Sequence, residues 1–290
     1  MTAGLERCSL NTGTVKLASL QEAVDATAAA GMGAIGLWRH QVQEHGAETA
    51  RKIVEDAGLR VSSLCRGGFL TAATPEGVKD AVEDNLRAIE EAAGVGTREL
   101  VFVVGGLPGS SPEQPPAPGT DRDVVAARAR VADRLADLAP IAAEHDVRIV
   151  LEALHPMFAA DRAVLSTLGQ ALDLAAPFDP ATVGVVVDTY HVWWDPELQA
   201  SIARAGREGR IAGYQICDWN LPFATSALNS RGHVGDGYID FTTISRWVAE
   251  AGYTGDVETE IFNEEIWAVD PTETAKTVAA RYTEHVAPHL

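Results

Sequence analysis

The sequence predicts an α/β fold in which one chain closes into a single (β/α)8 TIM barrel over residues 1–290. Three observations support this prediction. Short apolar runs of strand length alternate eight times with longer amphipathic segments, no change in composition divides the chain, and no glycine-rich dinucleotide fingerprint follows a strand. A doubly wound open sheet could also use eight such units, and the missing fingerprint weakens that alternative.

The expected strands are short runs rich in apolar and β-branched residues. The sixth is the clearest, because Val183–Val187 consists of small and β-branched residues, as in a strand that helices cover on both faces. In chain order the eight are Leu5–Asn11, Ala34–Trp38, Leu59–Cys65, Glu99–Val104, Arg148–Leu151 leading into Glu152, Val183–Val187, Ile211–Cys217 and Asp256–Ile261.

A helix is expected after each strand, and several carry start or stop signals. Glu76 lies in the first turn of the helix Pro75–Ala93 and Gly94 follows its end, while Gly58 and Gly252 close two others. The predicted helices are Ser19–Ala30, Glu44–Ala57, Pro75–Ala93, Asp121–His145, Ala163–Ala175, Pro196–Ala205, Phe241–Ala251 and Pro271–His285.

Charge and composition exclude some classes of partner. The chain has 41 acidic and 23 basic residues, a formal net charge of −18, so a nucleic acid backbone would be repelled. No apolar run approaches the ~20 residues of a membrane span, and the amino terminus has no apolar leader segment. We therefore expect no nucleic acid and no membrane as partner, and a homo-oligomer is compatible with the sequence.

The three cysteines, Cys8, Cys65 and Cys217, are odd in number, lack CxxC spacing and lie in apolar, strand-like surroundings. This pattern indicates reduced core residues in a cytoplasmic protein.

Side chains with oxygen donors follow the last four predicted strands. Glu152 ends the fifth, Asp188 ends the sixth, Gln215 lies in the seventh and Glu260 in the eighth, where Glu258 points to the same face. The carboxyl ends of barrel strands converge on one face, where active sites are built. Three carboxylates meeting there without a cation would raise each other's pKa. Oxygen donors of this kind suit one divalent cation, with Mn²⁺ and Mg²⁺ as the first candidates.

Two connections after strands are long, residues 105–120 and 218–240, and both are interpreted as lids over this face. Tryptophans expected at the same face could form a wall for the apolar side of a sugar, although core packing is the simpler interpretation of each; they are Trp38, Trp193, Trp194 and Trp219. Residues 66–68, Arg-Gly-Gly after the third strand, could bind a phosphate or carboxylate or form a plain turn.

The second half of the chain resembles the xylose-isomerase-like TIM-barrel family of sugar isomerases and epimerases. The resemblance rests on the stretches LEALHP, VVVDTYHVWWDP, QICDW, SRGHVGDGYIDF and VETEIFNE at successive strands. It implies that the metal ligands are Glu152, Asp188, Gln215 and Glu260, and that Glu152 and Glu260 are catalytic. It also implies a role in substrate binding for His191 and Arg231, and we add His155 and Trp38 as candidates for that role.

Two positions depart from the family pattern. The family usually has histidine where this chain has Gln215, and an amide oxygen is a weaker donor than imidazole. Ketose 3-epimerases of the family have a second glutamate shortly after the first, in a region that His155 and Phe158 occupy here.

The predicted reaction is proton transfer α to a carbonyl group of a sugar or keto-polyol through an enediolate, giving isomerisation or epimerisation. The same electron flow with loss of a β-substituent would make the protein a dehydratase or a lyase that cleaves a C-glycoside. Metal-dependent hydrolysis fits the net charge poorly. A non-catalytic barrel that has lost its metal is the remaining alternative, which the glutamine at position 215 favours.

Overall fold

A closed parallel barrel confirms the predicted (β/α)8 fold in the computed structural model, which describes residues 4–111, 114–116 and 118–290. Eight strands form the barrel: β1 (Cys8–Asn11), β2 (Ala34–Trp38), β3 (Arg60–Gly68), β4 (Glu99–Val103), β5 (Arg148–Glu152), β6 (Val183–Asp188), β7 (Ile211–Ile216) and β10 (Val257–Thr259). They follow one another around the barrel in sequence order, and β10 pairs with β1 to close it. A separate antiparallel pair joins β8 (Asp218–Trp219) to β9 (Arg231–Gly232).

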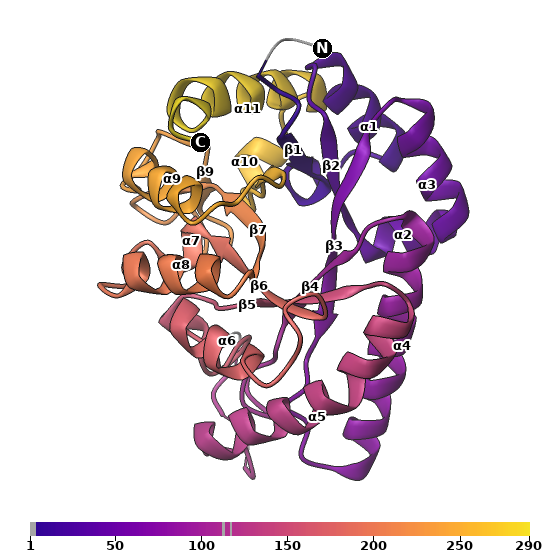
Figure 1. Ribbon diagram of the computed structural model, residues 1–290, viewed down its shortest axis with the longest axis vertical. Coiled ribbons are helices and arrows are strands. Elements are labelled where there is room, and N and C mark those ends of the chain that lie inside the picture. Colours follow the sequence, from indigo (N-terminus) through magenta and orange to yellow (C-terminus); the bar gives the residue numbers. More distant parts are fainter. Residues whose placement is uncertain (1–3, 112–113, 117) are drawn as a thin grey trace.

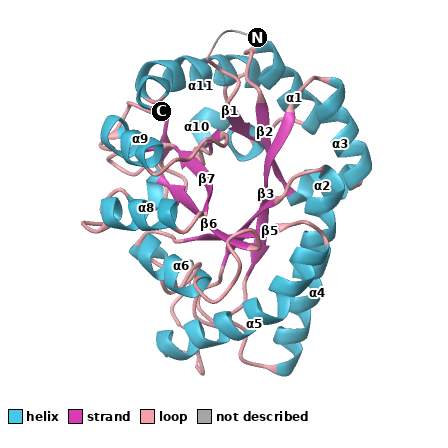
Figure 2. Cartoon of the chain, in the orientation of Figure 1, coloured by secondary structure: helices cyan, strands magenta, loops and turns pink. Residues whose placement is uncertain are grey.

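Helices surround the ring of strands, as Figures 1 and 2 show. The α-helices are α1 (Leu20–Ala29), α2 (Arg39–His45), α3 (Ala47–Asp56), α4 (Pro75–Val95), α5 (Val124–Glu144), α6 (Leu168–Ala175), α7 (Thr189–Val192), α8 (Leu198–Arg207), α9 (Phe241–Glu250), α10 (Glu264–Trp267) and α11 (Pro271–His285). Short 3₁₀ helices are η1 (Thr12–Val15), η2 (Pro156–Phe158) and η3 (Ala287–His289).

Helix boundaries differ from the predicted ones where a local cap decides them. The helix predicted over Glu44–Ala57 is two helices, α2 and α3, because Gly46 lies between them with φ of +79°. Helix α4 continues past Gly94 and ends at Gly96, which adopts the left-handed conformation with φ of +82°. Helix α6 begins only at Leu168, because the Thr167 hydroxyl caps it by accepting from the Gln170 N–H.

Strand β3 is longer than predicted and includes the Arg66-Gly67-Gly68 segment, so these residues do not form the plain turn that was one of their two interpretations. Gly68 has φ of +112°, and a Cβ there would overlap the carbonyl oxygen of Val103 on β4. Glycine thus lets β3 stay paired with β4 to its end. Arg66 is carried on this last part of the strand, at the carboxyl face of the barrel.

The main hydrophobic core lies between the strands and the helices, and a small cluster of Val150, Val186 and Ala212 lies apart from it. Cys8, Cys65 and Cys217 are buried and unbridged, as predicted. No described helix has the length and the apolar character needed to cross a membrane.

A cavity of about 440 Å³ occupies the amino-terminal end of the barrel. It is lined by Glu99 and Arg148, the first residues of β4 and β5. Arg148 Nη1 lies 4.0 Å from Glu99 Oε1, while Glu99 Oε2 has no hydrogen-bond partner among the described residues. Burial raises the pKa of Glu99 to about 7, and the charges of Arg148 and Arg98 only partly oppose this.

Glu99 is therefore expected to make the protein less stable as the pH rises. In the unfolded chain the glutamate ionises near pH 4.3, but in the folded chain it keeps its proton up to about pH 7. Between these values the folded state binds more protons, so the free energy of unfolding falls until the folded pKa is passed. At about 1.4 kcal/mol per pKa unit, the loss is at most about 4 kcal/mol.

Glu99→Gln should remove this contribution, so its stability relative to wild type should increase between pH 5 and pH 8 in urea unfolding curves. Glu90→Gln, on the exposed face of α4, is the control. Parallel stability profiles for Glu99→Gln and wild type would contradict the assignment.

Candidate active site

A pocket of about 310 Å³ opens at the carboxyl face of the barrel, the face predicted to hold the active site. Five of the predicted site residues line it, and they come from β2, β5, α7, β9 and the segment after β10: Trp38, Glu152, His191, Arg231 and Glu260. Asp188 lies just behind this lining with a relative exposure of 1%. Distant parts of the chain thus meet at one face.

Asp188 ends β6 and also caps α7. Its Oδ1 accepts the N–H of Tyr190 at 2.8 Å, which explains why a helical turn begins at once after the strand. Its Oδ2 has no hydrogen-bond partner among the described residues and lies 3.9 Å from His191 Nε2. Glu152, the last residue of β5, lies near the same ring, with Oε1 3.7 Å from His191 Nε2.

The structure separates Glu258 from Glu260, which the sequence could not do. Glu260 follows the last residue of β10 and faces the pocket, where Arg231 Nη1 donates to its Oε2 at 3.0 Å. Glu258 lies two residues deeper in the barrel. Its carboxylate accepts from four neutral side chains, namely Asn11, Ser62, Ser63 and Gln215.

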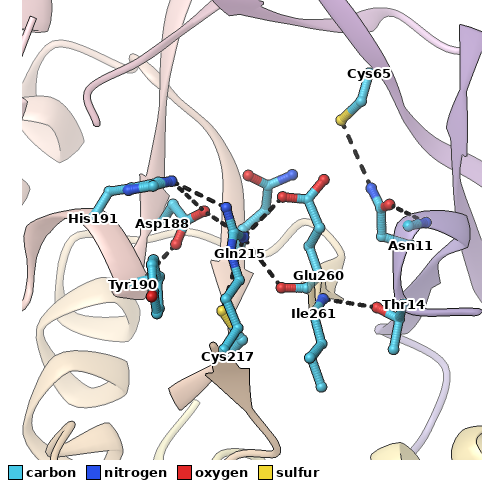
Figure 3. Close-up of polar contacts among 12 residues, drawn as sticks. Asn11, Thr14, Cys65, Asp188, Tyr190, His191, Gln215, Cys217, Glu260 and Ile261 are labelled. Carbon is cyan, nitrogen blue, oxygen red and sulfur yellow. Dashed lines mark hydrogen bonds and ion pairs between the residues drawn. The ribbon is translucent and has the colours of Figure 1, made fainter. Parts of the chain in front are cut away.

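Gln215 lies between the carboxylates of two neighbouring strands, with its Cα opposite Asp188 on one side and Glu258 on the other. Its Nε2 donates to Glu258 at 2.9 Å. An ionised carboxylate can only accept, so this bond orients the amide. The Oε1 is buried without a hydrogen-bond partner among the described residues, and the side chain borders the amino-end cavity rather than the pocket. Figure 3 shows Gln215 with Asp188 and Glu260.

Arg231 brings a fully buried positive charge to the carboxylates. Its Nη1 lies 3.0 Å from Glu260 Oε2 and 3.6 Å from Asp188 Oδ2. The guanidinium also lies over the rings of Tyr190 at 4.8 Å and Phe262 at 4.5 Å. Ion pairs and ring contacts together hold the orientation of the guanidinium. The antiparallel pairing of β8 with β9 positions the Arg231 backbone.

His191 is neutral, because burial and the neighbouring Arg231 charge lower the pKa of its ring well below the ordinary value. The backbone N–H of His155 donates to His191 Nδ1 at 3.1 Å, and Arg231 Nη2, which can only donate, lies 3.1 Å from Nε2. Both ring nitrogens therefore face a donor, although a neutral imidazole accepts at only one of them. Nε2 also lies 3.7 Å from Glu152 Oε1.

The predicted substrate-binding residue His155 does not bring its ring into the pocket. The ring lies 4.7 Å from that of Trp219 and 5.7 Å from that of Trp194, and its Nδ1 accepts from the Met157 N–H. Its backbone, not its side chain, reaches the site by fixing His191.

The predicted aromatic wall is also different from expectation, because Trp193, Trp194 and Trp219 pack away from the pocket and only Trp38 lines it. The aromatic lining is completed by three residues that sequence reasoning missed, namely Phe69, Phe262 and Trp267. Trp38 is held by its Nε1, which donates to Asn11 Oδ1 at 2.8 Å, and by an edge contact with Phe262.

Of the two long connections, 218–240 contributes Leu228, Asn229 and Arg231 to the pocket. Asp218 organises this segment, since its carboxylate accepts the N–H groups of Trp219, Gly235, Gly237 and Ile239. The described residues of 105–120 do not border the pocket, and residues 112–113 and 117 lie outside the described part.

Burial and mutual repulsion dominate the electrostatics of the carboxylates. Burial raises the pKa of Glu152 well above its ordinary value, and the charges of Asp188 and Glu260 raise it further. Burial also raises the pKa of Asp188, and that of Glu260 to about 7, against the opposing charge of Arg231. One guanidinium therefore compensates three buried carboxyl groups only in part.

These features fit a divalent cation. Glu152, Asp188 and His191 each offer a ligand atom within 4.8 Å of the others. Asp188 Oδ2 and Gln215 Oε1 are buried without a hydrogen-bond partner among the described residues. Hard oxygen donors and unneutralised carboxyl groups are what Mn²⁺ or Mg²⁺ requires.

Comparison with known proteins agrees with the fold. A family model described as xylose isomerase-like TIM barrel matches residues 24–285. A ketose 3-epimerase from Arthrobacter globiformis is 25% identical over 232 residues, which are 77% of this chain and 71% of that protein. A crystal structure of a protein from Sinorhizobium meliloti 1021 is 42% identical with a TM-score of 0.90, covering 97% of this chain and 99% of the other. The IolI protein, crystallised with a zinc atom, shares the fold at 18% identity with a TM-score of 0.82, covering 98% of this chain and 99% of its own.

Proposed function

The chain belongs to the xylose isomerase-like TIM barrel family, and we propose that it is a divalent-metal-dependent isomerase or epimerase of a sugar or keto-polyol. The observation that carries the proposal is the meeting of Glu152 and Glu260 at one pocket, with Asp188, His191 and Arg231 between them. Similarity to a ketose 3-epimerase supports the reaction class.

Two carboxyl groups that face one pocket suit proton transfer to and from carbon. One of Glu152 and Glu260, when ionised, removes the proton from the carbon α to the substrate carbonyl, and the other returns a proton. Return to the opposite face of the same carbon epimerises it, and return to the neighbouring carbon isomerises the sugar.

Arg231 and His191 orient the substrate. Both line the pocket and bind substrate oxygens next to the reacting carbon. Glu152, Asp188, Gln215 and Glu260 would hold the cation. When bound, a divalent ion supplies a Lewis acid that stabilises negative charge on the enediolate oxygens. The aromatic lining of Trp38 and Phe262 excludes water from the reacting atoms.

The test of this function is solvent deuterium exchange into a panel of ketoses, keto-inositols and keto-glycosides, with Mn²⁺ and with chelator. Exchange into at least one substrate that depends on the ion supports the proposal. Release of an aglycone or of water together with exchange would favour the lyase or dehydratase alternative. Absence of exchange, with a melting temperature indifferent to chelator, would favour a non-catalytic barrel.

Gln215→Leu tests whether the amide is a ligand. Leucine has a similar size but lacks Oε1. Mn²⁺ affinity measured by calorimetry should therefore fall at least about tenfold. In Gln215→His the imidazole can donate to Glu258 through one nitrogen and offer the other to the ion. The preference for softer ions such as Co²⁺ over Mg²⁺ should then increase.

Gln199→Leu, an exposed glutamine on α8, is the control. Wild-type Mn²⁺ affinity in Gln215→Leu would remove Gln215 from the ligand set.

A further inference from the structure

Basic residues collect around the pocket, although the chain as a whole is strongly acidic. Besides Arg231, the lining contains Lys16, His40, Arg66 and Arg162, and its only acidic residues in the described part are Glu152 and Glu260. The whole sequence has nearly two acidic residues for each basic one. The sign of the charge is therefore reversed at the mouth of the pocket.

Two of these cations have no acidic partner among the described residues. Arg66 makes no ion pair there, and its guanidinium carbon lies 4.1 Å from the ring centroid of Phe69. Lys16 is likewise without an ion pair in the described ranges, and its Nζ lies 4.5 Å from the centroid of Trp267. An aromatic face orients a cation without neutralising its charge, so both remain available to a ligand.

The neighbouring Arg39 shows the contrast. It is the first residue of α2, just after β2, and it is neutralised by Asp84 at 2.9 Å and by Glu91 at 2.5 Å. Arg66 lies beside it, since Arg39 Nη1 donates to the Arg66 carbonyl oxygen at 3.4 Å, yet it faces the pocket instead of these carboxylates. The unpaired charge is a property of the pocket rather than of the surrounding surface.

The cations are distributed around the mouth of the pocket, and Arg66 is the one that lies opposite the carboxylates. It is carried by β3, across the closed barrel from β6, β7 and the residue after β10, where Asp188 and Glu260 lie. Lys16 follows β1, the neighbour of β10, and Arg162 follows β5, so these two cations flank the carboxyl groups. The ion-pair partner of Arg162 among the described residues is its sequence neighbour, at 3.5 Å. A ligand that extends from the carboxyl groups across the pocket therefore meets the guanidinium of Arg66.

We propose that the substrate carries an anionic group, a phosphate ester or a carboxylate, at the end remote from the reacting carbon, and that Arg66 binds it, with Lys16 and Arg162 adding positive charge from the flanks of the pocket. The anion site rests on the proposed function in one respect only, namely which end of the substrate reacts. The planar guanidinium of Arg66 can donate two parallel hydrogen bonds to either anion. Lys16 and Arg162 add charge without demanding a fixed geometry.

The experiment compares matched ligands by calorimetry in the presence of chelator, so that neither turnover nor a bound ion is needed. A ketose, its terminal phosphate ester and the corresponding keto-uronate form the series, and inorganic phosphate serves as competitor. We expect the better of the two anions to bind at least tenfold more tightly than the neutral ketose, and the preferred anion identifies the group. In Arg66→Gln and Lys16→Gln this ratio should fall toward one. In Arg207→Gln, which removes an exposed charge on α8, the ratio should stay at the wild-type value.

Equal binding of neutral and anionic ligands by wild type would overturn the proposal, as would an unchanged ratio in Arg66→Gln that folds normally by circular dichroism. Failure of this inference is distinguishable from failure of the proposed function. Ion-dependent deuterium exchange into neutral ketoses without preference for anions contradicts only the anion site. An anion preference without exchange into any ligand contradicts only the catalytic proposal.

Discussion

Glu260→Gln is expected to lower the rate of solvent deuterium exchange by at least about 10³-fold, the upper part of the range for a positioned acid or base. The amide matches the carboxylate in shape but can neither take the proton from carbon nor return it. The substitution also removes the charge that Arg231 Nη1 meets at 3.0 Å. The rate is followed by NMR loss of the α-proton signal of whichever substrate exchanges with wild type.

Two measurements make this outcome specific. Mn²⁺ affinity of Glu260→Gln, measured alongside, separates loss of the base from loss of the ion. Glu265→Gln, an exposed position on α10, is expected to exchange at the wild-type rate. Exchange by Glu260→Gln within tenfold of wild type would assign the proton transfer to another group.

The strand-end argument was effective for Glu152, Asp188 and Glu260 because it depends on topology alone. Parallel strands of a closed barrel bring their carboxyl ends to one face, whatever rotamers the side chains adopt. It could not separate Glu258 from Glu260, since residues two apart on a strand share a face. Only the end of β10 at Thr259 does so, because it places Glu260 beyond the barrel interior that surrounds Glu258.

The orientation of side chains in the connections between strands could not be predicted from hydrophobic periodicity. His155 and the tryptophans lie in segments whose paths are set by tertiary contacts, and the ring of His155 packs on Trp219 instead of facing the pocket. Arg231 was indicated by family resemblance and not by spacing, since it reaches the site through the pairing of β8 with β9. No local pattern predicts that pairing across a connection of this length.

The basic side of the pocket shows what a wider use of the same argument would have found. Of these basic residues only Arg66 was considered as an anion ligand, in a segment expected after the third strand, whereas it lies within β3. Lys16, His40 and Arg162 lie in the segments that follow β1, β2 and β5. Examination of the segments after the strands for basic residues as well as for carboxylates would have identified them.

Arg231→Met is expected to lower the free energy of unfolding by about 3–5 kcal/mol in chelator at pH 8, the usual cost of removing one partner from a buried ion pair. Asp188 and Glu260 would lose the guanidinium that lies 3.6 and 3.0 Å from them. The two carboxyl groups would respond by holding protons to higher pH. The loss of unfolding free energy should therefore be smaller at pH 5, where a larger fraction of these carboxyl groups is protonated.

A divalent ion should replace part of the lost charge, because it neutralises the same carboxylates. Addition of Mn²⁺ is expected to raise the unfolding midpoint of Arg231→Met more than that of wild type in guanidinium titrations. Arg231→Lys keeps a charge but loses the planar contacts with Tyr190 and Phe262, and should lie between the two. If Arg231→Met were as stable as wild type in chelator at pH 8, these carboxyl groups would have to be protonated in the wild-type protein. Arg231 would then contribute to substrate binding and not to the charge balance of the fold.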